Sequence, residues 1–158
     1  MSTFAPNLVR PDKGKRQFSI VASQFNGEYV QGLIDHATDE LRSLSPDATI
    51  SLHQVPGAFE IPVVVREIAL QETADAILAL GVILQGKTSH AQNLARSVTD
   101  ALQRIAVEQG IPVINAVLSL ETEAQAEERC LGSEINRGTE AARAAVDIAR
   151  VMGDLRST

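Results

Sequence analysis

Cysteine and aromatic residues are scarce in this chain of 158 residues. It contains one Cys, no Trp, one Tyr and four Phe. The single cysteine, Cys130, excludes an internal disulfide and any metal site built from several cysteines. We interpret it as a small residue on a helix rather than as a nucleophile. Because the core must be built mainly from Ala, Val, Ile and Leu, each aromatic side chain needs a specific explanation.

Long apolar runs and an excess of positive charge are also missing. No run approaches the roughly 20 apolar residues that span a bilayer. The segment MSTFAPNLVRPDKGKRQ at the start has no apolar stretch of the kind found in signal peptides. The formal net charge of −6 argues against a general binder of nucleic acids or membrane surfaces. We therefore predict a cytoplasmic protein, in which one locally basic pocket would suffice for a small anionic ligand.

Strands alternate with helices along a length that suits one domain with a full core. We expect residues 1–16 to form a flexible N-terminal arm and residues 17–158 to form the folded domain. Apolar patterns predict strands at 17–23, 48–55, 75–84 and 111–120, and helices at 27–44, 61–69, 89–109, 122–131 and 135–155. This order is typical of a three-layer α/β/α, flavodoxin-like fold with a four-stranded, mainly parallel sheet and helices on both faces.

The predicted strands differ in their apolar pattern. Residues 75–84 and 111–120 are almost continuously apolar, which predicts strands buried on both faces. Residues 48–55 alternate apolar and polar positions, which predicts a strand nearer an edge. Ligands of such sheets bind at the carboxyl ends of the strands. The loops SQFNGE, VPGAFE, LQGKTSH and SLETEAQ follow those ends and hold the unusual residues of the chain, so we expect the site there.

Residues 81–88 satisfy G-x-x-x-x-G-K-[ST], the phosphate-binding loop of nucleotide hydrolases. In such a loop the four variable residues turn their backbone amides toward the phosphates. Here Val82, Ile83 and Leu84 continue an apolar strand, so we expect their backbone in the sheet. A P-loop nucleotide hydrolase therefore stays an alternative, and the true turn is the shorter segment QGKTSH.

That shorter turn opens a helix directly after a strand. Ser89 and Gln92 have the spacing of a capping box, with Thr88 as the alternative cap, and Gly86 allows close approach of the backbone to a ligand. The helix N-terminus favours one phosphate or carboxylate. His90 would lie in the first turn beside that anion, where an imidazole can transfer protons near neutral pH. The alternative is a plain turn with a solvated histidine.

Other candidate residues lie in the remaining segments. Gly57 permits close backbone approach, and Glu60 lies at the start of a helix, whose N-terminus it would serve in the simpler interpretation. Phe25 would offer a stacking face for a flat heterocycle, although an isolated Phe is more often part of a core. Arg129 and Arg137 would bind phosphate only if their guanidinium groups were held rigidly. Each taken alone is more typical of a surface charge.

Together these residues resemble a known family. The motifs FNG, VPGAFEIP, LGVILQGKTSH, GIPVINAVLSLETEAQAEER and NRG occur in the order and spacing of the 6,7-dimethyl-8-ribityllumazine synthases. The resemblance runs from about residue 18 to residue 152. It implies a transferase that condenses 5-amino-6-(D-ribitylamino)uracil with 3,4-dihydroxy-2-butanone 4-phosphate, the penultimate step of riboflavin biosynthesis. The implied steps are imine formation, phosphate loss and ring closure, with no metal or organic cofactor.

The resemblance also implies roles for individual residues. His90 matches the catalytic residue that transfers protons. Positions that match the binding site for the heterocycle and ribityl chain are Phe25, Asn26, Gly57, Ala58, Phe59, Glu60, Ile83 and Asn115. Positions that match the phosphate site are Gly86, Lys87, Thr88 and Arg129, with Arg137 as a more distant candidate.

The resemblance further implies an assembly. In the family, the arginine that matches Arg129 reaches across from a neighbouring subunit, so the site would form only in a pentamer. Compared with family members that form shells of sixty subunits, the segment 129–138 has no insertion. The resemblance therefore implies an icosahedral shell of sixty subunits. Riboflavin synthase is the candidate protein partner, and we expect no nucleic-acid or membrane partner.

Four positions depart from the family pattern. The family usually has Arg at Gln85, an aromatic residue at Ala91, Phe at Asn115 and Lys at Arg137. Replacing Lys by Arg keeps the charge but changes its geometry. The two lost aromatic residues leave open a second alternative, a catalytically weak assembly protein that binds flavin or lumazine.

Overall fold

The structure is a computed structural model, which describes residues 5–6, 8–9, 15–86 and 89–157. Its parallel strands form one sheet in the order β2-β1-β3-β4. The strands are β1 (Gln17–Ser23), β2 (Thr49–Val55), β3 (Ala76–Leu84) and β4 (Val113–Leu120). The helices are α1 (Gly27–Leu44), α2 (Ile61–Leu70), α3 (His90–Gln109), α4 (Glu123–Ala126) and α5 (Arg137–Arg156), with a short 3-10 helix η1 (Ala58–Glu60) and a π-helix η2 (Glu127–Leu131).

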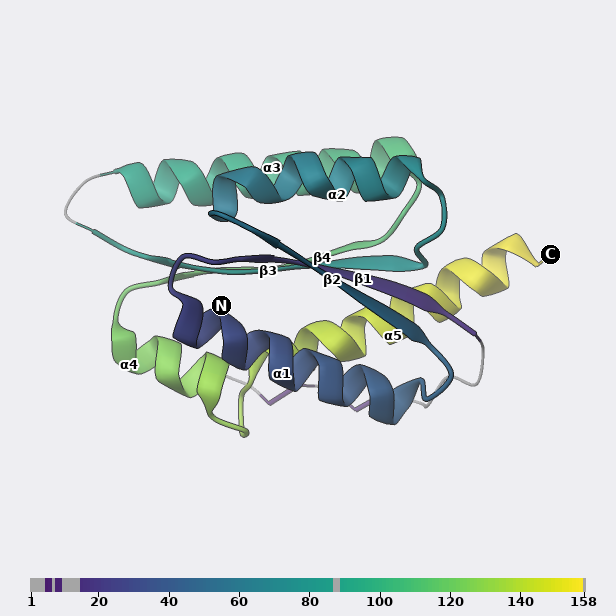
Figure 1. The fold of residues 1–158 in the computed structure, drawn as a ribbon, viewed down its shortest axis with the longest axis horizontal. Coiled ribbons are helices and arrows are strands. Elements are labelled where there is room, and N and C mark those ends of the chain that lie inside the picture. The colour runs from purple at the N-terminus through teal and green to yellow at the C-terminus, as the bar shows by residue number, and fades with distance from the viewer. Residues whose placement is uncertain (1–4, 7, 10–14, 87–88, 158) are drawn as a thin grey trace.

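Helices cover both faces of the sheet. Helices α2 and α3 lie on one face, and α1, α4 and α5 lie on the other (Figure 1). In β3, Ile77 and Ala79 pack toward α2 and α3, whereas Leu78 and Leu80 pack toward α1 and α5, because successive side chains of a strand point to opposite faces. The predicted three-layer, flavodoxin-like α/β architecture is confirmed.

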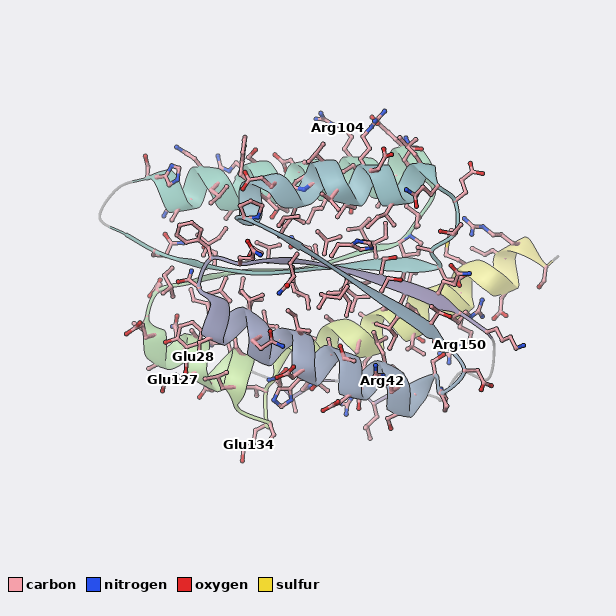
Figure 2. The ribbon with its side chains drawn as sticks, in the orientation of Figure 1. Glu28, Arg42, Arg104, Glu127, Glu134 and Arg150 are labelled. Atoms are coloured by element: carbon pink, nitrogen blue, oxygen red, sulfur yellow. The ribbon has the colours of Figure 1, made fainter. Side chains whose placement is uncertain are left out.

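Charged side chains lie on the outer surfaces of the helical layers. Arg104, on α3, points away from the sheet on one side, and Glu134, between η2 and α5, does so on the other (Figure 2). The buried polar residues include Arg129, Asn136 and Arg137, which lie in η2 and at the start of α5. Among the described residues, no helix is long and apolar enough to cross a membrane.

Local backbone features begin and end the helices. Asn26 precedes α1 with φ 56°, a left-handed conformation that Asn tolerates better than most residues. Gly110 ends α3 with φ 67°, as is common for glycine after a helix. Asn136 caps α5 with its side chain. These residues therefore determine where the helices begin and end relative to the loops at the two ends of the sheet.

Two local predictions are wrong. Strand β4 is an edge strand rather than a strand buried on both faces, and its Asn115 and Ser119 are exposed. The side chain of Ser89 makes no capping hydrogen bond, since its φ of −74° and ψ of 0° are already helical, whereas a capping side chain reaches the helix amides from an extended backbone. The alternative cap, Thr88, lies outside the described residues.

Candidate functional site

A pocket of about 440 Å³ lies at the carboxyl ends of β1 and β3, on the side of the sheet that α2 and α3 cover. Its walls come from the loop after β1, from η1, from the end of β3 and from the first turns of α3. The sequence-predicted residues that line it are Phe25, Asn26, Gly57, Ala58, Phe59, Ile83 and His90. Three of the four expected loops thus meet at one place.

Two aromatic side chains of the pocket are open to solvent. Phe25 is 73% exposed and Phe59 is 67% exposed. In a chain with only four Phe, these two contribute little to the core, so the interpretation of Phe25 as a core residue is wrong. An exposed aromatic face beside a pocket is suited to stacking on a flat ring.

The loop that carries Phe25 is held by backbone and side-chain hydrogen bonds. The Phe25 amide donates to the carbonyl of Pro56 at 3.2 Å. The side-chain amide of Asn26 donates to the carbonyl of Val82 at 2.7 Å, and the backbone carbonyl of Asn26 accepts from Val30 at 3.1 Å. The loop after β1 is therefore tied to the loop after β2 and to the end of β3.

Glu60 is turned toward its own loop. Its Oε1 accepts a hydrogen bond from the Gly57 amide at 2.9 Å, so the carboxylate serves the turn that begins η1, as the simpler interpretation expects. Glu60 is not among the residues that line the pocket. A direct role toward the substrate stays a prediction.

The end of β3 rules against a nucleotide-binding P-loop. Residues 82–84 pair with residues 118–120 of β4, so their backbone is extended in the sheet and does not wrap around a phosphate. Gly86 follows and is exposed. Lys87 and Thr88, both predicted to bind phosphate, lie outside the described residues.

His90 begins α3 and lines the pocket. The first turn of this helix carries no acidic residue, so the partial positive charge of the helix end is not offset there. The sequence-predicted proton-transfer residue and the sequence-predicted anion site thus share one helix terminus.

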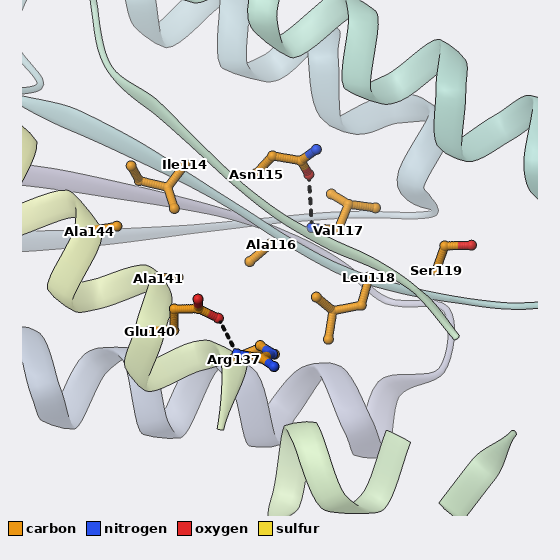
Figure 3. A pocket seen from close by; sticks show the side chains of 10 residues that line it. All are labelled: Ile114, Asn115, Ala116, Val117, Leu118, Ser119, Arg137, Glu140, Ala141 and Ala144. Atoms are coloured by element: carbon orange, nitrogen blue, oxygen red, sulfur yellow. Dashed lines mark hydrogen bonds and ion pairs between the residues drawn. The ribbon is translucent and has the colours of Figure 1, made fainter. Parts of the chain in front are cut away.

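Asn115, Arg129 and Arg137 do not reach this pocket. Asn115 and Arg137 line a second cavity of about 480 Å³ beside β4 (Figure 3). Asn115 donates to the hydroxyl of Thr99 at 3.2 Å and accepts from the Val117 amide at 3.1 Å. Arg129 lies in η2, within the helical layer opposite to that of α3 (Figure 1). Within one chain, the predicted arginines therefore lie away from His90.

Both arginines are buried and incompletely paired. Arg129 is 8% exposed and Arg137 is 3% exposed. The Nη1 of Arg137 donates to Glu140 at 2.6 Å. The Nε of Arg129, and the Nε and Nη2 of Arg137, have no hydrogen-bond partner among the described residues. Because buried polar groups are normally paired, these guanidinium groups are suited to an anion or a partner group.

Cys130, next to Arg129, is fully buried. Burial raises the pKa of its thiol to about 12, against a smaller lowering by the charge of Arg129. The thiol is therefore protonated at neutral pH, in agreement with the interpretation that it is not a nucleophile. In the described part of the chain, no three His, Cys, Asp or Glu side chains gather closely enough to hold a metal ion.

Sequence reasoning missed two polar residues that join the site loops to their surroundings. Ser119, on β4, accepts a hydrogen bond from the side chain of Gln85, which directly follows β3. Asn136 bonds to backbone on both sides of the segment between η2 and α5. The sequence placed Asn136 in the NRG motif and inside a helix predicted over 135–155, whereas α5 begins at Arg137 and Asn136 is its N-cap.

Comparison with known proteins gives relatives over nearly the whole chain. The chain is 40% identical over 155 residues to the 6,7-dimethyl-8-ribityllumazine synthase of Corynebacterium glutamicum, covering 97% of this chain and 95% of the relative. It is 39% identical to that of Streptomyces coelicolor, covering 94% and 92%. It is 34% identical to that of Desulfotalea psychrophila, covering 99% and 100%.

The family assignment rests on more than pairwise identity. Residues 15–153 match the sequence profile named 6,7-dimethyl-8-ribityllumazine synthase, and these residues include every loop that lines the pocket. The chain therefore belongs to the 6,7-dimethyl-8-ribityllumazine synthase family.

Proposed function

We propose that this chain condenses 5-amino-6-(D-ribitylamino)uracil with 3,4-dihydroxy-2-butanone 4-phosphate to form 6,7-dimethyl-8-ribityllumazine. This transferase reaction is the penultimate step of riboflavin biosynthesis, and it releases the phosphate group as inorganic phosphate. Membership of the family over residues 15–153 supports the proposal. Conservation of the activity is expected because the relatives match along nearly the full chain.

The observation that carries the proposal is the chemistry of the pocket. Exposed aromatic faces at Phe25 and Phe59 stand beside the imidazole of His90 at a helix N-terminus. A flat pyrimidine would stack on an aromatic face, while the helix end would attract the phosphate of the second substrate. His90 would then lie between the two substrates, where it can move protons during imine formation and ring closure.

The remaining predicted residues divide between the two substrates. Asn26, Gly57 and Ala58 would hold the pyrimidine and its ribityl chain, partly through backbone groups. Gly86 would contact the phosphate together with Lys87 and Thr88. The hydrogen bonds that tie the loop after β1 to Pro56 and Val82 favour this use, because catalysis depends on holding two reactants in fixed relative positions.

Arg129 would complete the phosphate site from a neighbouring copy. Support comes from its position in the helical layer opposite to that of His90, with a buried guanidinium that is not fully paired. An arrangement in which each copy lends Arg129 to the next is heterologous, and it closes in a ring. We propose a pentamer, twelve of which would form a sixty-subunit shell, with riboflavin synthase as the candidate protein partner.

One experiment tests the activity directly. The purified protein is incubated with both substrates while lumazine absorbance and released phosphate are followed together. Equal amounts of lumazine and phosphate are expected above the uncatalysed background. Absence of product above that background would overturn the proposal.

A second candidate, a weakly catalytic flavin- or lumazine-binding protein, is favoured by one observation. Ala91 lines the pocket where the family usually has an aromatic residue, which leaves more room for a bound heterocycle. This candidate predicts that the purified protein carries a yellow ligand and makes no product in the same experiment.

The nucleotide hydrolase differs in its response to substitution. If the chain is a nucleotide hydrolase, changing Lys87 should severely reduce its activity. If it is a lumazine synthase, changing Arg129 should do so instead. Because a guanidinium binds phosphate through two parallel hydrogen bonds, we expect Arg129→Ala to lower kcat/KM for the phosphorylated substrate by at least about 100-fold. Comparing Arg129→Ala with Lys87→Ala, in lumazine formation and in ATP hydrolysis, separates the two.

A further inference from the structure

Asn136 lies between the two segments that carry the buried arginines. It is fully buried. Its side-chain Nδ2 donates to the carbonyls of Cys130 at 3.0 Å and Gly132 at 2.8 Å. Its Oδ1 accepts from the amides of Gly138 at 2.8 Å and Thr139 at 3.1 Å. Both N–H donors and the carbonyl oxygen of the amide are therefore in use.

Each half of this amide fixes backbone beside one arginine. Cys130 directly follows Arg129 in η2, and carbonyls at the end of a helix lack partners within it. The Asn136 donors supply those partners. On the other side, the Asn136 oxygen caps the first turn of α5, whose first residue is Arg137. One side chain thus joins the end of η2 to the beginning of α5.

The π-helical form of η2 makes these hydrogen bonds of Asn136 important. A π-helix is rare and is found frequently at functional sites. Here it spans Glu127–Leu131 and contains Arg129. The backbone of Gly132 donates to the carbonyl of Glu127 at 2.9 Å, and Asn136 then bonds to the carbonyl of Gly132. Asn136 therefore stabilises the end of the π-helical turn that carries Arg129.

Close backbone packing leaves this junction little room to shift. A Cβ atom on Gly32 of α1 would lie 2.4 Å from the carbonyl oxygen of Cys130. A Cβ atom on Gly138 of α5 would lie 2.4 Å from the carbonyl oxygen of Leu33. The backbones of η2 and α5 are thus both pressed against α1, so the carbonyl that Asn136 binds has a fixed position.

We propose that Asn136 is a positioning residue of the phosphate site, which acts through Arg129 by holding the end of η2 in its π-helical form. This inference rests on the proposed phosphate-binding role of Arg129. It goes beyond that role, because it assigns the orientation of the guanidinium to one buried amide. A purely structural cap of α5 would need only the Oδ1 half of the side chain.

Two variants of Asn136 separate the two halves of the amide. Asn136→Ser retains an oxygen that can cap α5 but removes both donors to Cys130 and Gly132. Asn136→Ala removes the cap as well. Arg156→Ala is the matched control, because it removes another side-chain hydrogen bond to a backbone carbonyl, that of Gly110 at 2.7 Å, from the far end of α5.

The readout is the affinity for inorganic phosphate, measured by isothermal titration calorimetry, together with both KM values and the thermal midpoint. We expect Asn136→Ser to weaken phosphate binding and raise the KM of the phosphorylated substrate by roughly 5- to 50-fold, as misplacement of a binding group predicts. The KM of the pyrimidine should change by less than about twofold. Arg156→Ala should leave phosphate binding unchanged.

A double-mutant cycle tests whether the effect passes through Arg129. In an Arg129→Lys background, Asn136→Ser should weaken phosphate binding by less than about twofold, since coupled residues are not additive. The proposal is overturned if the two effects multiply. It is also overturned if Asn136→Ser lowers only the thermal midpoint, or if the wild-type protein does not bind phosphate.

The outcomes also separate this inference from the proposed function. A wild type that binds phosphate but forms no lumazine contradicts the proposed function, while the phosphate affinities of the variants still decide the role of Asn136. A wild type that forms lumazine, with Asn136→Ser binding phosphate normally, contradicts the inference alone.

Discussion

At the scale of single residues, His90 differs chemically from the other side chains that line the pocket. Among the described residues that line the pocket, it is the only one with a titratable side chain. An imidazole can both accept and donate a proton near neutral pH. Imine formation and ring closure each move protons between nitrogen and oxygen atoms, so His90 is the residue of this pocket that can assist both.

We predict that His90→Ala slows turnover by roughly 10- to 1000-fold, the range of general acid–base catalysis. Because His90 is exposed at the start of α3, the substitution should leave the fold intact. Steady-state kinetics with both substrates gives kcat, and circular dichroism checks the fold. An unchanged kcat would remove His90 from the mechanism.

Residue types predicted the pocket better than they predicted individual contacts. Phe25 and His90 stood out because aromatic residues are scarce and because a helix was expected at residue 89. The contact between Glu60 and Gly57 depends on a rotamer that no pattern specifies. The role of Asn136 depends on two segments that pack together only in the fold, and the helix predicted over 135–155 placed this residue inside the helix rather than at its cap.

At the scale of elements, the spacing of apolar residues was sufficient to predict where most strands and helices begin and end. Strand β1 and helix α1 begin and end at the predicted residues, because a short apolar run ends at Ser23 and a longer amphipathic helical pattern begins at Gly27. Strand β4 was wrongly predicted to be buried. Its sequence is apolar except for Asn115 and Ser119, which are the exposed positions, and strand order is decided by connections that periodicity does not contain.

We predict that Gly32→Ala destabilises the protein through the contact between α1 and η2. The new Cβ would lie 2.4 Å from the carbonyl oxygen of Cys130, and backbone cannot move aside as a flexible side chain can. Overpacking of this kind costs about 1–3 kcal/mol in unfolding free energy, which urea titration measures.

Gly27→Ala in the same helix is the matched control for this prediction. A Cβ atom on Gly27 has no neighbour within 4 Å, so its effect should be that of helix propensity alone, about 1 kcal/mol or less in the stabilising direction. Equal effects of the two substitutions would contradict the packing argument.

At the scale of the whole molecule, alkaline pH should lower stability. Burial raises the pKa of Cys130 from 9.0 to about 12. Between these values the unfolded chain has lost the thiol proton and the folded chain keeps it, so rising pH favours the unfolded state. Burial and neighbouring carboxylates, that of Glu123 foremost, also raise the pKa of Tyr29, which acts in the same direction.

We predict that unfolding free energy falls as pH rises from about 9 to about 12, and that Cys130→Ala makes this fall shallower. Urea titrations at several pH values measure the slope for each protein. The comparison uses slopes because loss of the sulfur also leaves a cavity, which lowers stability at every pH. Identical slopes would show that the thiol does not contribute.

The proposed assembly would divide the site between copies. One chain presents His90 in the pocket and holds Arg129 in the opposite helical layer (Figure 1). If each copy lends its arginine to the next, a chain without His90 and a chain without Arg129 carry complementary defects. Their mixed assembly contains some sites in which both groups are intact.

We predict that co-assembly of His90→Ala and Arg129→Ala chains restores about a quarter of wild-type activity, since random order around a closed ring places an intact His90 against an intact Arg129 at about one interface in four. The two variants are co-expressed with different tags, purified through both tags and assayed for lumazine formation. Pairing either variant with the His90→Ala/Arg129→Ala double variant is the control and should restore nothing. Activity no higher than the sum of the separate variants would mean that both groups act within one chain, and the shared site would have to be abandoned.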